Sequence, residues 1–183
     1  MNAVAAVDLG VTARVAAWLA GLTALTALAI HLVAGAATRD LLAFGFGGVE
    51  PTFGTAAGIF ANNVRVLAAV LVAAAAVQLG FTERGDRWEG ATLFALRSLC
   101  DAVIALGCAI HVLVIGAAFG AYGGRTLAAT ALHAPGELAA FSLALGLYLR
   151  ARRGRADLRT FAVTSTLAVG ALAVAALAET FAY

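Results

Sequence analysis

The chain has 183 residues, of which 63% are hydrophobic and only 12% are charged, with a formal net charge of +2. A soluble domain carries about 25% charged residues, because its surface has to face water. The composition therefore excludes an ordinary soluble domain and predicts a membrane protein. Its apolar runs are continuous, whereas the strands of a membrane barrel alternate apolar and polar residues. We therefore expect an all-α protein.

Five apolar segments are each near the roughly 20 residues that a bilayer core requires. We expect one transmembrane domain over residues 1–183 that forms a polytopic helix bundle. The connection 38–54 is rich in glycine and predicts an irregular, partly re-entrant loop. The connection 81–98 combines charges with Trp88, Leu93 and Phe94, which predicts an amphipathic stretch on the membrane surface. The expected spans are residues 11–35, 55–80, 99–122, 133–149 and 158–181.

All twelve basic residues are arginines, and their positions predict an orientation. Five of them lie in residues 150–159, and arginine-rich short connections stay on the cytoplasmic side. Alternation of five spans then puts the N-terminus inside and the C-terminus outside. Nine arginines fall inside, Arg39 and Arg125 fall outside, and Arg65 lies within a span. The inside surface, residues 84–97 and 150–159, is expected to meet anionic lipid or a cytoplasmic partner.

Ionisable side chains within membrane spans are costly, so they mark functional sites by default. Asp101 lies near the inner end of the third span, whereas almost all the others fall in the predicted outer half. We expect the outer set to form a polar site, although His31 by itself is interpreted as a packing residue. The outer set is His31, Asn62, Asn63, Arg65, His111, His133, Glu137 and Glu179.

His133 and Glu137 are four residues apart, so they share a helix face. They form either an acid–base pair, with Glu179 as a third catalytic candidate, or a structural pair at a helix start. Pro135 favours a helix start at this point. Both interpretations place the pair at the outer end of the fourth span.

Asn62, Asn63 and Arg65 form a second group, in the second span. As structural residues, the asparagines bond across helices and Arg65 pairs with a carboxylate of the outer set. As substrate-binding residues, they hold a carbonyl or carboxylate group of a substrate. His111, in the middle of the third span, is a further substrate-binding candidate.

A zinc site could draw on Cys108 with His111 and on His133 with Glu137. Neither pair matches a strong metal motif, and no metal or cofactor is expected. Cys100 and Cys108 would lie about 12 Å apart along a helix, too far for a disulfide. Both are interpreted as small buried side chains.

Gly116, Gly120 and Gly124 follow one another at four-residue spacing near the outer end of the third span. Small residues at this spacing let two helices approach closely. The spacing leaves open whether the second helix belongs to the same chain or to a second copy.

Three segments resemble motifs of one known family, the stage II sporulation protein M (SpoIIM) family. Residues 59–67, IFANNVRVL, resemble its asparagine motif, and residues 132–141, LHAPGELAAF, resemble its histidine and glutamate motif. Residues 175–181, AALAETF, are similar to its closing glutamate motif. The residues in matching positions include Gly116, Gly120, His133, Glu137 and Glu179.

The resemblance implies a helical protein of the bacterial cytoplasmic membrane without an established catalytic activity. The family's namesake works with cell-wall hydrolases as a membrane anchor or scaffold. Relatives accompany genes for circular bacteriocins, where they are linked to maturation or export of a peptide. The expected partners are therefore membrane lipid, a partner protein or further copies of the chain, and a peptide substrate; a nucleic acid is not expected.

Two functions stay open. The first is a membrane subunit that docks a partner and helps handle, mature or export a peptide or cell-envelope substrate. The second is an intramembrane enzyme that performs acid–base chemistry on a ribosomally made peptide, such as cyclisation or epimerisation.

Overall fold

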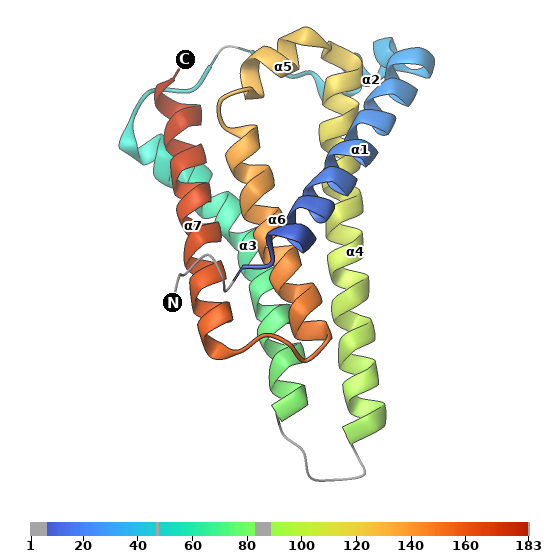
Figure 1. Cartoon of the computed structure of the whole chain (residues 1–183). Coiled ribbons are helices and arrows are strands. Elements are labelled where there is room, and N and C mark those ends of the chain that lie inside the picture. Colours follow the sequence, from blue (N-terminus) through green and yellow to red (C-terminus); the bar gives the residue numbers. More distant parts are fainter. Residues whose placement is uncertain (1–6, 47, 83–88, 183) are drawn as a thin grey trace.

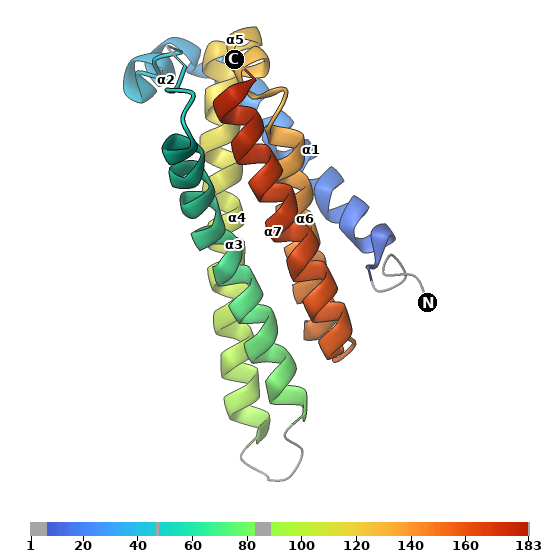
Figure 2. The same ribbon diagram turned by 90° about the vertical axis from the view of Figure 1, so that its left-hand side faces the viewer.

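The computed structural model describes residues 7–46, 48–82 and 89–182, and every regular element among them is an α-helix. The helices form an elongated bundle that α1 crosses obliquely (Figures 1 and 2). The prediction of an all-α bundle is confirmed. The helices are α1 (Leu9–Val33), α2 (Gly35–Leu42), α3 (Phe53–Thr82), α4 (Glu89–Tyr122), α5 (Gly124–Thr130), α6 (Ala134–Arg152) and α7 (Leu158–Phe181).

Within the described residues, α1, α3, α4 and α7 are each long and apolar enough to cross a membrane. The pair α5 and α6 passes the same test but is bent by 73° at the break between them. The described part of the chain therefore has four helices able to span a membrane, or five if the bent pair counts as one, in agreement with the prediction of about five. The predicted span 133–149 corresponds to α6.

The connections lie at two opposite ends of the bundle. One end holds α2, α5 and the end of α7, and we name it the outer end, following the orientation predicted from the arginines. The other end holds the end of α3, the beginning of α4 and the α6–α7 connection, and we name it the inner end (Figure 1). The arginine-rich connection thus lies at the same end as the beginning of α4, as alternation requires.

Several connections differ from expectation. The prediction of an amphipathic stretch on the membrane surface is wrong for Glu89–Ser98, because these residues form the first part of the single helix α4. A charged side chain is tolerated here because Arg97 and Asp101 lie one turn apart on α4 and interact electrostatically. Residues 83–88 of that stretch, which include Trp88 and the arginines at 84 and 87, lie outside the described residues. The short connection expected over residues 123–132 contains α5, and the connection 38–54 begins within α2.

The core lies where α6 packs between α3 and α7. Leu67 of α3, Leu147 of α6 and Leu172 of α7 are fully buried there. Small residues keep the three helices close, as at Gly136, where a Cβ would lie 3.2 Å from the Cβ of Ala175. This core holds α3, α6 and α7 as one group.

Two glycines join α1 to α4. A Cβ at Gly116 would lie 2.6 Å from the Cβ of Thr26, and a Cβ at Gly120 would lie 2.5 Å from the carbonyl oxygen of Ala27. Both distances are shorter than real Cβ contacts, so glycine is required for this approach. The four-residue spacing therefore serves packing within the chain. Gly124 has nothing within 4 Å of its Cβ position and takes no part.

Tyr122, the last residue of α4, forms hydrogen bonds with α2 and with the chain that follows α2. Its hydroxyl donates to the carbonyl oxygen of Arg39 at 3.0 Å and accepts the backbone N–H of Phe44 at 2.9 Å. Its ring also meets that of Phe46 edge-on, with centroids 5.1 Å apart. The outer end of α4 is therefore covered by the segment after α1.

Candidate functional site

The centre of the candidate site is a hydrogen bond between α3 and α6. The side-chain amide Nδ2 of Asn63 donates to Oε1 of Glu137 at 2.5 Å, and both groups are partly buried. A carboxylate among apolar side chains needs such a donor, because burying it without one is costly. Two residues of the predicted set, from different motifs, therefore meet in the outer half of the bundle.

Three further predicted residues surround this bond. The carboxylate of Glu137 interacts electrostatically with His133, Glu179 and His111. His133 directly precedes α6, one turn before Glu137, whereas Glu179 is on α7 and His111 is on α4. The three predicted catalytic candidates and two of the predicted substrate-binding residues thus lie within electrostatic range of one carboxylate, and four helices position them.

The hydrogen bond is recessed below the outer end. The rings of Phe53 and Phe181, 5.2 Å apart, mark the outer ends of α3 and α7. Asn63 lies ten residues further along α3, which is about 15 Å along the helix axis. Gly136, in the first turn of α6, packs against Ala175, so α6 begins well below the end of α7.

The titratable groups therefore form a column that descends from the outer end. Glu179 lies two residues before the end of α7, Glu137 lies opposite Asn63, and His111 lies eleven residues before the end of α4, or about 17 Å along its axis. Such a column connects the outer surface with the middle of the bilayer by polar side chains.

His133 has an open hydrogen-bonding position. Its side chain is 8% exposed, and its Nδ1 atom is buried without a hydrogen-bond partner in the described part of the chain. An unsatisfied buried nitrogen is costly, so this atom marks a place where a substrate group or a proton carrier can bind. Pro135 lies at the beginning of α6, as predicted.

His111 is held by its own helix. Its Nδ1 lies 3.0 Å from the carbonyl oxygen of Gly107. A carbonyl oxygen only accepts, so Nδ1 carries the proton and Nε2 is the nitrogen available to another group. The ring also packs against that of Phe141, with centroids 5.8 Å apart.

Asn62 and Arg65 lie on the other face of α3. Both are exposed, whereas Asn63 is partly buried and Leu67 is fully buried. The expected pairing of Arg65 with a carboxylate is wrong, because Glu137 is bonded to Asn63, and Arg65 makes no hydrogen bond or ion pair with any residue that the structure describes. The predicted substrate-binding group is therefore split, and Asn63 alone of the three faces the site.

Metal binding finds no support in the described ranges, where no group of three or more His, Cys, Asp or Glu side chains is placed to hold an ion. Cys108 and His111 share α4 but do not converge with the pair on α6 into such a group. Cys100 is buried and Cys108 half-buried, and both thiols are free.

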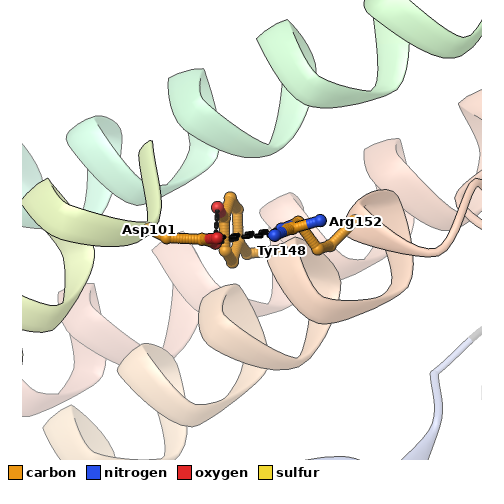
Figure 3. A network of polar contacts seen from close by, with 3 residues as sticks. All are labelled: Asp101, Tyr148 and Arg152. Carbon is orange, nitrogen blue, oxygen red and sulfur yellow. Dashed lines mark hydrogen bonds and ion pairs between the residues drawn. The ribbon is translucent and has the colours of Figure 1, made fainter. Parts of the chain in front are cut away.

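A second polar cluster lies toward the inner end, where sequence analysis singled out only Asp101. Figure 3 shows its carboxylate between two side chains of α6. Arg152 donates from Nη2 at 2.7 Å and from Nε at 3.1 Å, and the Tyr148 hydroxyl donates at 2.5 Å. The cluster joins α4 to α6 far from Glu137. Its signal in the sequence was the four-residue spacing of Tyr148 and Arg152, which puts both on one face of α6.

A half-open hollow of about 350 Å³ lies apart from both clusters, between the α1–α2 break and the end of α4. His31 and Arg39 line it on one side and Gly120 and Tyr122 on the other. His31 is exposed here, so its interpretation as a packing residue is wrong. The hollow contains none of the residues around Glu137.

Comparisons with known protein families, with curated proteins and with solved structures find no match to this chain. Two carboxylates, two imidazoles and an amide are brought together by four helices, and such groups bind the polar part of a substrate or pass a proton.

Proposed function

We propose that this protein is a multi-pass subunit of the bacterial cytoplasmic membrane, related to the SpoIIM family. It binds a peptide or cell-envelope substrate at the polar site in its outer half and helps a partner protein to handle, mature or export that substrate. The hydrogen bond between Asn63 and Glu137 supports this proposal most directly, because it holds a recessed carboxylate that also interacts with His133 and Glu179. The three segments that resemble the family each contribute to this arrangement.

The site has the groups that a peptide requires. Its carboxylate accepts hydrogen bonds from a peptide N–H or an ammonium group, and Nδ1 of His133 offers a further position one turn away. Within apolar surroundings each such bond is stronger than in water. The column of polar groups from Glu179 downwards gives a polar substrate a path from the outer surface to Glu137.

A partner is needed for work on the substrate. The sequence has no glycine-rich phosphate-binding motif, so a nucleotide-driven step has to come from another chain, and a proton gradient is the other source of energy. The inner basic connection, residues 150–159, offers a surface for such a partner or for anionic lipid.

Acid–base catalysis is the second candidate, and the unpartnered Nδ1 of His133 favours it. An imidazole and a carboxylate one turn apart can take a proton from a bound peptide and return it at another position. Cyclisation and epimerisation of a ribosomally made peptide both require such transfers. Asn63 would then hold Glu137 in place during the reaction.

The test starts from a deletion strain. Mass spectrometry of its secreted peptides and of its cell envelope, compared with the parent strain, identifies the product that the protein helps to make. The strain is then complemented with Glu137→Gln, His133→Gln or Glu179→Gln. Glu137→Gln removes the charge but keeps an oxygen that can accept from Asn63, so the fold is retained. Glu50→Gln, at an exposed carboxylate outside the helices, is the matched control.

We expect the control to restore the product and Glu137→Gln to fail at equal protein level. Accumulation of an uncyclised or unepimerised peptide with Glu137→Gln would favour catalysis over binding. Full restoration by all three site variants would show that the polar site serves packing alone.

A further inference from the structure

One exposed face of α3 differs from the other exposed faces of the bundle. The other exposed faces carry large apolar side chains among their small ones, as at Leu25 of α1 and Leu106 of α4, which are 63% and 62% exposed. On α3 the exposed side chains between the outer end and the middle are small or polar. We name this the Arg65 face, and its members are Gly58, Ala61, Asn62, Arg65, Ala68 and Ala69.

Arg65 lies in the middle of its span. It is the thirteenth of the 27 residues Phe53–Leu79 that form the membrane-crossing part of α3. The two ends of that segment lie about 18 Å and 21 Å away along the axis. An arginine side chain extends less than half of either distance, so it cannot carry its charge to either end of the span.

The charge is also not compensated by the residues that the structure describes. Arg65 makes no hydrogen bond or ion pair with any residue in the described ranges. The carboxylates of Asp101 and Glu137 have other partners, since Asp101 is bonded to Arg152 and Glu137 to Asn63. A guanidinium left against lipid at this depth is costly, so another molecule has to cover it.

We propose that the Arg65 face docks a transmembrane helix of a partner protein that carries a carboxylate near the middle of its span. The small residues above and below Arg65 let that helix approach closely. The guanidinium then forms a bidentate pair with the carboxylate, and Asn62, which is exposed on the same face, provides a third hydrogen bond. This deepens the proposed role as a subunit, on which it rests.

The charge also argues against a second copy as the occupant. A two-fold axis between two Arg65 faces would bring one Arg65 against the other, because such interfaces use the same patch on both chains. Like charges at this depth repel without screening by salt. The occupant is therefore a different chain, with the opposite charge.

The test measures energy transfer between the full chain and a synthetic transmembrane peptide in phosphatidylcholine vesicles. The peptide is a leucine–alanine helix with one glutamate in its middle, and a companion peptide has leucine at that position. We expect the glutamate peptide to bind the native chain about tenfold more tightly than the leucine peptide. Arg65→Leu should remove this preference, and Arg65→Lys should keep most of it because the charge stays.

Packing is tested separately by a larger side chain on the same face. Ala61→Phe should weaken binding of the glutamate peptide severalfold, whereas Ala162→Phe, at an exposed alanine of α7, should not. Glu137→Gln should bind the peptide as the native chain does. If the complementation test refutes the role of the Glu137 site, the peptide-binding test of the Arg65 face is still valid. If the peptide-binding test fails, the complementation test is still valid.

Two results would overturn the proposal. One is equal binding of the two peptides to the native chain, or an unchanged preference with Arg65→Leu. The other comes from mixing donor-labelled and acceptor-labelled copies of the chain. Energy transfer between them that Arg65→Leu abolishes would show that a second copy covers this face.

Discussion

Replacing Gly120 with alanine should push α1 away from α4. The new Cβ would lie 2.5 Å from the carbonyl oxygen of Ala27 and 2.7 Å from the Cβ of Ile30. Neither atom can turn away, because one belongs to the backbone and the other is fixed to it. Ordinary van der Waals contact begins at 3.4 Å, so α1 has to move outwards by about 0.9 Å at this point.

Such overpacking costs about 1–3 kcal/mol in the free energy of unfolding. Gly120→Val places two more atoms in the same space and should cost more than alanine.

The assay is unfolding in mixed micelles with increasing sodium dodecyl sulfate, followed by circular dichroism and by the fluorescence of Trp18 on α1. Gly107→Ala is the matched control on the same helix, since nothing lies within 4 Å of its Cβ position. It should leave the protein unchanged or stabilise it by up to about 1 kcal/mol, because alanine favours helix over glycine. Equal losses for Gly107→Ala and Gly120→Ala, or no loss for either, would refute the packing argument.

Three further predictions concern polar contacts. Asn63→Leu should destabilise the fold by about 1–3 kcal/mol because it leaves the Glu137 carboxylate without its hydrogen-bond donor. Glu137→Gln should destabilise it less. Unfolding in detergent compares the free energies of unfolding of the two variants. A double-mutant cycle with Asp101→Asn and Arg152→Ala should give a coupling free energy of about 1 kcal/mol or less. The reason is that the two side chains are 42% and 37% exposed. A larger coupling free energy would show that the pair is shielded from water. The pKa of Asp157 lies below its ordinary value because its carboxylate accepts a backbone N–H at the beginning of α7. Its cap therefore stabilises the fold above about pH 4 and is lost as the pH falls through the lowered pKa, so Asp157→Ala should remove this pH dependence from the unfolding curve.

Hydropathy alone was sufficient to find the spans, because each apolar run is long enough to cross a bilayer. It misplaced the beginning of α4 by ten residues. Leu93, Phe94 and Arg97 suggest a surface helix when they are considered alone. In the structure they form the first turns of α4, which continues without a break into the apolar span. Pro135 indicated where α6 begins and gave no information on the 73° bend before it, which depends on how α5 packs over the outer end.

The candidate site was predicted in part. The polar residues were found from depth, and the structure brings five of them together around Glu137. The error at Asn62 and Arg65 could have been avoided, because neighbouring residues on a helix point about 100° apart. Asn62 and Arg65 share a face that Asn63 cannot share. The spacing of Gly116 and Gly120 predicted a close approach between two helices. It could not identify the second helix, because the same spacing allows close packing against any helix.

The contact between α1 and α4 also has a consequence for biogenesis. The main packing surface of α1 lies on α4, a helix that ends about 90 residues later in the chain. At about 5–20 residues per second, α1 waits on the order of 4–17 seconds before Gly116 and Gly120 are synthesised. During that interval the insertion machinery or a membrane chaperone has to shelter α1, so the yield of folded protein should depend on the rate of translation between α1 and α4.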